Sequence, residues 1–416
     1  MPAPERRSRG DVAAAALIAA IVLMAGTALW WGSDARSTSS RTAAAPGPET
    51  SLPEPTSPPA SLRQVWRAPS AATPVPVVAD GTVVTGDGGE VAGRDPWTGA
   101  VRWSYRRDVP LCTVGAGTGD VLAVHRDGGY CADVTGLDAA DGARGAQRTG
   151  PLRPPTRLLS EGNLVAATGQ RYLEVWRNDL VRTLQYGALP TPVKPGAQPR
   201  TGCSFGSVVV APGLLGVIER CPGQRSDRLT VQQADPSDED RPEVDFSTLL
   251  PGRGATLVAQ SRDRSAVAMP DPARLVVLDG SGRVVAEHPL DVPAEDVRGE
   301  PTEHLLAGSS ISTGGVVPTT SGAGVIYWFT GSSTVALGGP ELRPLWSIPQ
   351  TLGPGTLRAG RLLVPVPDGL AVVDTATGQQ ERLLPVDRGG YTGPVATASA
   401  GAILLEQRGA TLVALR

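Results

Sequence analysis

The four cysteines are the residues whose type and spacing point most directly to chemistry. Cys112 and Cys131 form one pair, about 19 residues apart, and Cys203 and Cys221 form a second, about 18 apart. An even number of cysteines beyond an apolar N-terminal segment favours disulfides in an oxidising compartment. These spacings suit a bond across two neighbouring strands, and free buried thiols are the alternative. A zinc site is disfavoured because no C-x2-C spacing is present.

The histidines do not form a metal or catalytic motif. The chain has three, His125, His288 and His304, and none is spaced as a pair of zinc ligands on one helix turn. We interpret each as a hydrogen-bonded or exposed loop residue. The sequence contains neither a Gly-x-Ser-x-Gly elbow nor a Gly-x4-Gly-Lys phosphate loop. The glycines of residues 115–119 precede a predicted strand rather than a helix, so they do not fit a dinucleotide site.

An acidic run between residues 235 and 245 is the remaining candidate for metal binding. Its carboxylates are the ligands that calcium prefers, but the run lacks the regular oxygen spacing and the glycine of a calcium loop. We therefore expect a solvated loop between strands. The net charge of −3 and the pI of about 5.8 disfavour a nucleic acid partner.

The N-terminus carries a predicted membrane anchor. Val12–Trp31 is an uncharged run of about 20 residues, which as a helix spans a bilayer core. Three arginines precede it, so residues 1–11 are predicted to be a short cytoplasmic tail. Trp30 and Trp31 are predicted to anchor its outer end at the membrane interface. A cleaved signal peptide is the alternative, although its apolar region is usually shorter and ends in small residues.

Two further regions follow the anchor. Residues 32–61 are rich in Pro, Ser, Thr and Ala, so they bury little apolar surface and are predicted to be a disordered linker. Residues 62–416 show short apolar strands separated by Gly, Pro and Asp turns, which is typical of an all-β repeat fold. The Ala-, Arg-, Gly- and Pro-rich composition is typical of high-GC, actinobacterial-type genomes.

A recurring turn identifies the repeat. Two strands are followed by Asp-x-x-Thr-Gly, where Asp accepts backbone hydrogen bonds and Gly takes a positive φ. The two best copies and the weaker ones supply these repeat-turn residues: Asp95, Thr98 and Gly99; Asp374, Thr377 and Gly378; Asp138 and Gly142; and Asp279.

These segments resemble the PQQ-like β-propeller repeats of quinoprotein-type proteins. Val83–Trp103 and Leu362–Gly378 match best, and residues 401–415 match only the first part of a blade. The missing strand is found at Arg63–Arg67, so we expect the two ends of the domain to share one blade. The resemblance implies an eight-bladed β-propeller, with seven blades as the alternative. We expect most tryptophans to pack between blades, and Trp97 to be exposed in its turn.

The resemblance also raises the question of a quinone cofactor. The family includes PQQ-dependent dehydrogenases, but this chain has no Cys-Cys dipeptide and no matching metal-binding set. We therefore expect no cofactor, no catalytic residues and no metal site. The leading hypothesis is a single-pass, extracytoplasmic scaffold in the cell membrane that presents a rim or central funnel to an envelope protein or cell-wall ligand. A PQQ- or sugar-binding oxidoreductase or sensor is the alternative, and a spacer without a ligand is a third.

Overall fold

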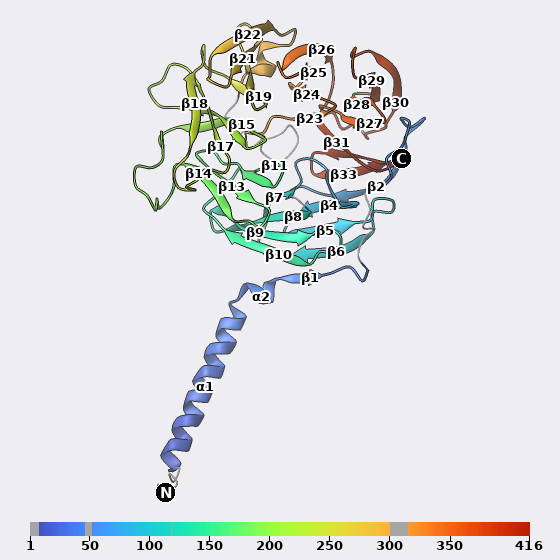
Figure 1. The fold of residues 1–416 in the computed structure, drawn as a ribbon. Helices are drawn as coiled ribbons and strands as arrows, with labels where there is room; N and C mark the ends of the chain where they lie inside the picture. The colour runs from blue at the N-terminus through green and yellow to red at the C-terminus, as the bar shows by residue number, and fades with distance from the viewer. Residues whose placement is uncertain (1–7, 46–51, 118, 300–314) are drawn as a thin grey trace.

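The chain folds into an eight-bladed β-propeller behind one long N-terminal helix (Figure 1). This computed structural model describes residues 8–45, 52–117, 119–299 and 315–416. Within them, the strands form eight antiparallel sheets arranged around a ring. The prediction of eight blades is confirmed, and the seven-bladed alternative is wrong.

We number the blades by their innermost strands. Blades 2 to 7 each have four strands in sequence order from the axis outward, whereas blade 1 gains a fifth strand and blade 8 takes its outermost strand from the other end of the domain. The innermost strands are β3 (Val77–Ala79), β7 (Leu111–Ala116), β11 (Leu158–Glu161), β15 (Ser204–Ala211), β19 (Thr256–Gln260), β23 (Thr319–Gly322), β27 (Thr356–Arg358) and β31 (Val395–Ala400). The second strands are β4 (Thr82–Asp87), β8 (Asp120–Asp127), β12 (Leu164–Ala167), β16 (Leu214–Arg220), β20 (Arg264–Met269), β24 (Val325–Phe329), β28 (Arg361–Val366) and β32 (Ile403–Arg408).

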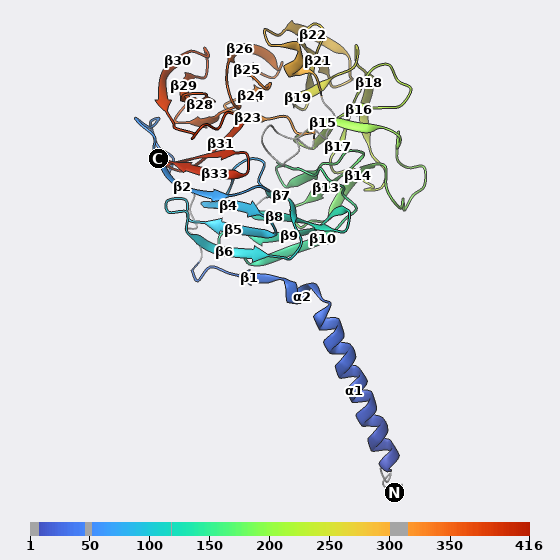
Figure 2. The ribbon, with the colours of Figure 1, turned by 180° about the vertical axis from the view of Figure 1, so that it is seen from behind.

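The outer half of each blade completes the disc, which Figure 2 shows from behind. The third strands are β5 (Glu90–Arg94), β9 (Tyr130–Asp138), β13 (Tyr172–Arg177), β17 (Arg228–Gln233), β21 (Arg274–Asp279), β25 (Ser333–Gly338), β29 (Gly369–Asp374) and β33 (Thr411–Leu415). The outermost strands are β6 (Val101–Arg106), β10 (Arg144–Thr149), β14 (Arg182–Gly187), β18 (Val244–Leu249), β22 (Val284–Pro289), β26 (Arg343–Pro349), β30 (Gln380–Pro385) and β2 (Gln64–Pro69). A short helix, α3 (Ala294–Val297), follows blade 5.

The ring closes through the strand nearest the N-terminal end of the domain. β2 pairs antiparallel with β33, and Trp66 lies opposite Ala414. Blade 8 therefore combines three C-terminal strands with one strand from the other end of the domain, as the sequence predicted.

The apolar core lies between blades rather than within them. It divides into eight clusters, each shared by two neighbouring blades. In β28, Leu362 packs toward blade 6 and Leu363 toward blade 8, because successive side chains point to opposite faces of a sheet. Both faces of the sheet are thus covered, which explains the unbroken apolar runs in the sequence.

A tryptophan joins one blade to the turn of the next at three positions. The buried Trp103 of blade 1 donates from Nε1 to the carbonyl of Ala139 at 3.0 Å, and its ring lies against Gly142. Trp66 and Trp346 make the same bond to Pro96 at 2.8 Å and to Thr375 at 3.1 Å. These tryptophans pack between blades, as expected.

The Asp-led turns form the surface that receives these rings. Asp95 Oδ1 accepts from the backbone N–H of Thr98 at 2.8 Å, and Asp374 Oδ1 from that of Thr377 at 3.0 Å. Asp138 accepts from Ala140 at 2.8 Å, and Asp279 from Ser281 at 2.9 Å. Gly99, Gly142 and Gly378 have φ of 72°, 78° and 73°, and a Cβ at each would lie within 2.8 Å of the tryptophan ring.

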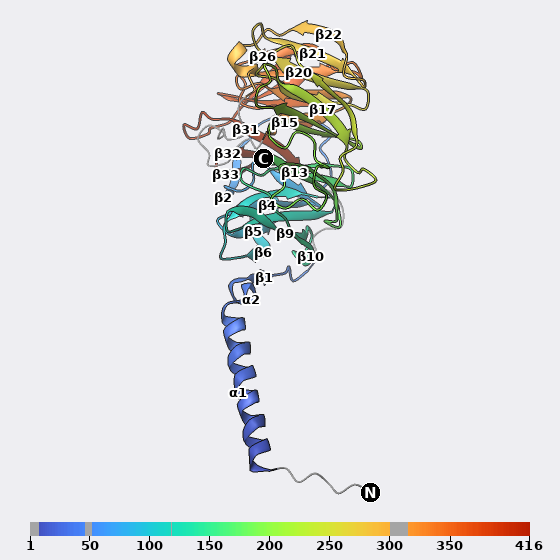
Figure 3. The same ribbon diagram turned by 90° about the vertical axis from the view of Figure 1, so that its left-hand side faces the viewer.

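Helix α1 (Arg9–Trp31) is long and apolar enough to cross a membrane, and a signal sequence near the N-terminus passes the same test. Ser8 caps its first turn through the backbone N–H of Asp11. At its other end the Arg36 guanidinium lies 5.9 and 5.2 Å from the rings of Trp30 and Trp31. Figures 1 and 3 show α1 leaving the outer edge of the disc rather than either face.

The segment expected to be disordered contains ordered contacts. After the short α2 (Asp34–Ser37), β1 (Ser39–Arg41) pairs with β6 and adds a fifth strand to blade 1. Further along, the side chain of Arg382 donates to the carbonyl of Pro59 at 2.7 Å. The expectation of disorder was wrong for β1, because the free edge of an outer strand offers backbone groups that any extended segment can pair with. The boundaries of the linker remain a prediction.

A glycine series in blade 2 tests the joint between blades. Gly142→Ala should destabilise the protein by about 3 kcal/mol, because it combines a positive φ with a clash against Trp103. Gly128→Ala, with φ of 55° and open space around the new Cβ, should cost only about 1 kcal/mol. Gly129→Ala has neither problem and should stay within about 0.5 kcal/mol. Urea denaturation of the three variants measures this order, and equal losses for Gly128 and Gly142 would show that the tryptophan contact contributes nothing.

Candidate functional site: the central funnel and its rim

The innermost strands enclose a cavity of about 420 Å³, which we call the funnel. Seven of the eight blades contribute described residues to its wall, mostly from the inner strand or from the segment just before it. This volume falls within the range of small-molecule sites. The described residues that line it are Pro74–Pro76, Arg157–Ser160, Val208–Val210, Val258, Val316–Thr320, Phe329, Leu352–Pro354, Tyr391, Pro394–Thr397, Gln407 and Gly409.

The wall of the funnel is mostly apolar and carries one charge. Among the described lining residues, Arg157 is the only ionisable side chain with a charge at neutral pH. It is 7% exposed, and burial lowers its pKa to about 10. That value lies well above 7, so the guanidinium stays protonated at neutral pH. The funnel therefore combines an apolar wall with one buried positive charge.

Most polar groups of the wall are bonded to the protein itself. Thr320 Oγ1 donates to the carbonyl of Gly355 at 2.8 Å, and the Tyr391 hydroxyl to that of Pro394 at 2.8 Å. Gln407 Nε2 donates to the carbonyl of Ser70 at 2.9 Å, and the Ser160 hydroxyl bonds to the carbonyl of Ala116. A ligand would therefore meet mainly methyl groups and ring edges.

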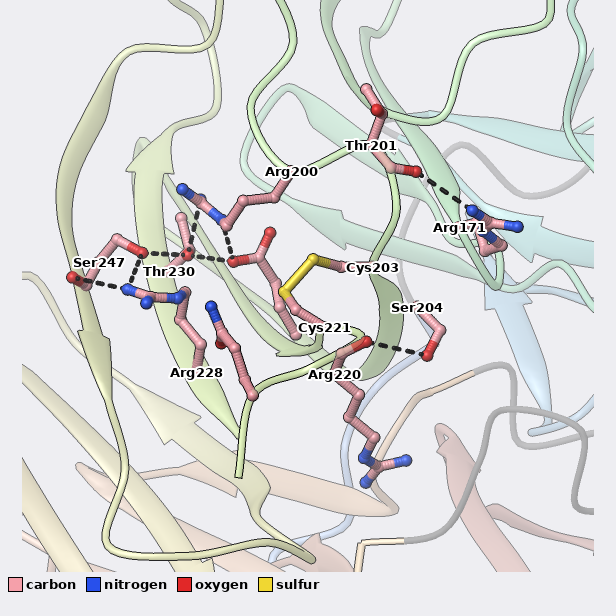
Figure 4. Close-up of a disulfide and its surroundings, with 12 residues drawn as sticks. Arg171, Arg200, Thr201, Cys203, Ser204, Arg220, Cys221, Arg228, Thr230 and Ser247 are labelled. Atoms are coloured by element: carbon pink, nitrogen blue, oxygen red, sulfur yellow. Dashed lines mark hydrogen bonds and ion pairs between the residues drawn. A yellow bond between two sulfur atoms is a disulfide. The ribbon is translucent and has the colours of Figure 1, made fainter. Parts of the chain in front are cut away.

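Both disulfides lie at one face of the disc. In each blade the first strand starts, the second ends and the third starts at the same edge, because neighbouring strands are antiparallel. Cys112 is near the start of β7, and Cys131 near the start of β9. Cys203 precedes β15, and Cys221 follows β16 (Figure 4). We call this the funnel face, because the funnel is also lined by the starts of inner strands.

The two disulfides differ in which strands they join. Cys203–Cys221 links the ends of the adjacent strands β15 and β16, as the spacing predicted. Cys112–Cys131 links β7 to β9, which are separated by β8, so the expectation of neighbouring strands is wrong for this pair. Its physical reason is a register shift in β7 between Leu111 and Thr113, which places Cys112 opposite no residue of β8.

Buried carboxylates lie between blades rather than in the funnel. Glu219 accepts from Arg200 Nε at 2.9 Å and from Thr230 Oγ1 at 2.7 Å. Figure 4 shows Arg200 and Thr230 near the disulfide of Cys203 and Cys221. Burial, followed by the charge of Glu219, raises the pKa of Tyr186, which also donates to this carboxylate.

Two further buried carboxylates follow the same pattern. Glu174 accepts from Arg148 Nη2 and from Trp176 Nε1, both at 2.7 Å. Glu406 lies between Arg388 and Arg408, at 2.8 and 2.6 Å. Each carboxylate is neutralised by arginine, so these groups join strands and blades, which is a structural role.

The other sequence candidates remain apart from the funnel. Trp97 is 38% exposed in its turn, and the Arg416 guanidinium carbon lies 4.8 Å from the centroid of its ring. In the acidic run, Lys194 pairs with Asp238 at 2.6 Å and Arg182 with Glu239 at 2.9 Å. In the described part of the chain, no group of three or more His, Cys, Asp or Glu side chains is arranged to hold a metal.

The histidines fall in different settings. His125 lies in strand β8 and is fully buried, so its interpretation as a loop residue was wrong, and His304 lies outside the described residues. The Nε2 atom of His125 lies 3.2 Å from the carbonyl oxygen of Gly89. Burial lowers the pKa of His125 to about 4, the Gly89 contact opposes that shift, and Arg107 adds to it.

The funnel does not fit a quinone cofactor. A PQQ site would need an aromatic stacking floor and a calcium ion, and calcium binds through carboxylate and carbonyl oxygens. Among the described residues of the funnel wall there is no tryptophan, aspartate or glutamate. We therefore derive no redox step at this site.

Arg157 and the valine-rich wall were missed by the sequence analysis. Val208–Val210, near the end of β15, and Val316–Pro318, just before β23, are visible in the sequence only as short uncharged runs. Only closure of the ring brings these runs together.

Comparison with known proteins supports the repeat assignment over part of the chain. A family model of PQQ-type repeats, described as outer membrane protein assembly factor BamB, matches residues 59–196. This match contains blades 1 to 3, so the first part of the propeller carries BamB-like repeats. No curated protein sequence matches the chain.

Several solved structures are similar to this chain. BamB from Moraxella catarrhalis is 15% identical, with 85% of this chain and 99% of that one covered and a TM-score of 0.48. Dihydro-heme d1 dehydrogenase NirN in complex with DHE is 14% identical, with 75% and 66% covered and a TM-score of 0.48. Sqt1 from Saccharomyces cerevisiae is 10% identical, with 88% and 99% covered and a TM-score of 0.49. At these identities and TM-scores they carry no argument about what this chain binds.

Removing either disulfide should destabilise the protein to a similar extent. The bonds close loops of 19 and 18 residues, for which chain entropy predicts a loss of about 3 kcal/mol each. The variants are Cys112→Ala/Cys131→Ala and Cys203→Ala/Cys221→Ala, compared with the parent chain by urea denaturation under non-reducing conditions. A reducing agent should lower the parent to the level of a variant lacking both bonds, and an unchanged midpoint would contradict a stabilising role.

The buried histidine should make stability depend on pH. Because the folded pKa of about 4 lies below the unfolded value of 6.5, the unfolded chain binds the extra proton between these values. The contribution of neutral His125 is complete above pH 6.5 and is lost as the pH falls toward 4, by about 3 kcal/mol. His125→Gln should flatten this decline relative to the parent in urea denaturation at pH 4 to 7. Parallel curves for the two chains would contradict the assignment.

Proposed function

We propose that this protein is a membrane-anchored, extracytoplasmic scaffold that binds a partner at the funnel face of its propeller. The observation that carries the proposal is the funnel itself, an apolar cavity enclosed by seven blades. A mostly apolar concavity with a few polar groups is the usual form of a binding site. The BamB-like repeats of its first part are consistent with a protein partner in the envelope.

Two features support the proposed location. Helix α1 has the length and composition of a single membrane span, with the tryptophans at the end nearer the propeller. Disulfides form and persist outside the cytoplasm, and the described residues contain two. Together they favour a cytoplasmic N-terminus and an extracytoplasmic propeller.

The position of the anchor supports access to the funnel face. Only Gly32–Thr38 separates α1 from β1, which is paired with the outer edge of blade 1. With α1 spanning a bilayer, this edge faces the membrane and both faces of the disc point sideways (Figure 3). A partner anchored in the same membrane would therefore meet the funnel face without passing beneath the propeller.

Site-specific photo-crosslinking in intact membranes tests this proposal. A photoreactive amino acid replaces Val75, which lines the funnel and is 46% exposed. The control replaces Val284, which is 47% exposed on the outermost strand of blade 5. A discrete crosslinked protein is expected at position 75 and not at 284.

Two results would contradict the scaffold. Equal labelling at both positions would show no preference for the funnel face. Calcium-dependent uptake of added PQQ by the full-length chain, seen as a bound chromophore, would instead support the oxidoreductase alternative.

A further inference from the structure

The funnel face of blades 2 to 4 carries a group of exposed arginines. In each blade the end of the second strand, the turn after it and the segment leading to the next inner strand lie on this face. In blades 2 to 4 these positions hold five exposed arginines, which we call the arginine arc: Arg126, Arg153, Arg171, Arg225 and Arg253. The other exposed charges there are Asp127 and Lys194, and Lys194 pairs with Asp238 at 2.6 Å. This part of the face is therefore positive.

The corresponding positions of blades 5 to 8 have the opposite sign. Their exposed charged residues, among those the structure describes, are five acids and one arginine: Asp271, Asp291, Glu295, Asp368, Asp387 and Arg298. The positive charge of the arc is thus a local feature of blades 2 to 4, and it is not a consequence of the composition of the chain, whose net charge is −3.

The arc has no counter-charge within the described part of the protein. None of its five arginines forms an ion pair there, and their bonds go to neutral groups. Arg153 Nη2 donates to the Tyr130 hydroxyl at 3.0 Å. Arg171 Nη2 donates to the carbonyl of Thr201 at 3.3 Å. Such bonds orient a guanidinium but leave its charge uncompensated, so the arginines repel one another until an anion binds.

Contacts within the face connect the arginines and hold their turns in place. Arg225 lies in the turn Cys221–Asp227, and Arg253 bonds to a backbone carbonyl of the same turn. The disulfide from Cys203 to Cys221 ties this turn to the segment that Arg171 contacts (Figure 4). Turns fixed in this way lose little conformational freedom when a ligand binds them.

The first disulfide braces the other end of the arc. Cys131 directly follows Tyr130, and the Arg153 guanidinium carbon lies 4.8 Å from the centroid of the Tyr130 ring. Both disulfides found in the described residues therefore support the part of the face that carries the arginines.

We infer that the arginine arc binds an acidic segment of a protein partner, with its carboxylates on the arginines and its apolar side chains in the adjoining funnel. The inference rests on the proposed function, because it uses the same face, and it adds the chemistry of the partner.

Two properties of the face favour an acidic segment with apolar residues. A guanidinium recognises a carboxylate through two parallel hydrogen bonds. The funnel wall beside the arc is apolar and includes Leu158, Leu159 and Val208–Val210 from blades 3 and 4. An anionic phosphate polymer would satisfy the arginines but has no apolar group for the funnel, and a neutral segment would leave the arginines uncompensated.

Fluorescence polarisation with a synthetic peptide tests the inference on the full-length chain in nanodiscs of a zwitterionic lipid. The probe is a short peptide with two Glu for every Leu, labelled with an uncharged dye. Replacing its Glu by Gln should weaken binding at least about tenfold, because several ion pairs are lost. Replacing its Leu by Ser should also weaken binding about tenfold, because the funnel loses its apolar contacts. Added salt should weaken binding of the Glu and Leu peptide, because it screens exposed charges.

A matched pair of double variants locates the site. Arg126→Gln/Arg225→Gln should weaken peptide binding about fivefold, and neither side chain makes a hydrogen bond or ion pair within the described residues, so folding should be preserved. The control is Arg262→Gln/Arg343→Gln, which removes the same charge from exposed positions without ion pairs on the opposite face. It should leave binding unchanged.

Three results would overturn the acidic segment. The first is absence of peptide binding at low salt, and the second is an equal loss in the two double variants. The third is equal binding of the Leu and Ser peptides together with displacement by inorganic polyphosphate, which would make an anionic polymer the ligand. Dimerisation of the parent chain at low salt that is absent in Arg126→Gln/Arg225→Gln would instead make a second copy the occupant.

The outcomes also separate this inference from the proposed function. A discrete protein crosslink at position 75 without binding of the acidic peptide would leave the scaffold standing with a partner of different chemistry. Peptide binding at the arc without a crosslink at position 75 would leave the acidic site and remove the support for a partner in the funnel.

Discussion

A ring of blades is stable only when every blade has two neighbours, and the pairing of β2 with β33 provides the last of these contacts. Each sheet buries both faces, so an open ring would expose one face of blade 8 and one of blade 1 to water. The cluster between those blades contains Trp66 from β2 with Val83 from β4. A single strand from near the N-terminus therefore protects both the last blade and the joint to the first.

Neighbouring blades are joined by two kinds of polar contact, a tryptophan hydrogen bond or a buried carboxylate–arginine pair. Blades 8, 1 and 6 extend a tryptophan onto the glycine of the next turn, where ring stacking and an indole hydrogen bond act together. Between blades 2, 3 and 4 the joints instead contain buried carboxylates, with Glu174 held by Arg148 and Glu219 held by Arg200. Buried ion pairs contribute little net stability, but removing one partner is costly because the other charge remains in the interior. This part of the ring also contains both disulfides, each of which joins strands of a single blade.

The funnel is a consequence of the ring. The short inner strands do not fill the axis of an eight-bladed disc, so they leave a cavity lined mainly by Val, Leu and Pro side chains of the described residues. The disulfides brace two inner strands on either side of blade 3, the blade that supplies Arg157. The attachment of β1 to the outer edge of blade 1 keeps helix α1 away from both faces.

Local sequence was sufficient to predict the repeat unit. The Asp-x-x-Thr-Gly turns, the apolar runs and the incomplete C-terminal blade depend on backbone geometry and side-chain burial within about 20 residues. They led to eight blades, to the shared blade at Arg63–Arg67 and to tryptophans between blades. The apolar N-terminal helix was also evident, because its length and lack of charge follow from composition alone.

Features that need segments far apart in the sequence to come into contact could be known only from the tertiary structure. The pairing of β1 with β6 was not predictable from a linker composition, because it depends on an open strand edge elsewhere in the chain. The bond between the non-adjacent strands β7 and β9 depends on a register shift in β7. Arg157 looked like one of many arginines until the ring placed it in a wall drawn from seven blades. The sequence by itself determined the repeat and its turns, because these are local. Only closure of the ring determined the cavity and the one charge among the described residues of its wall.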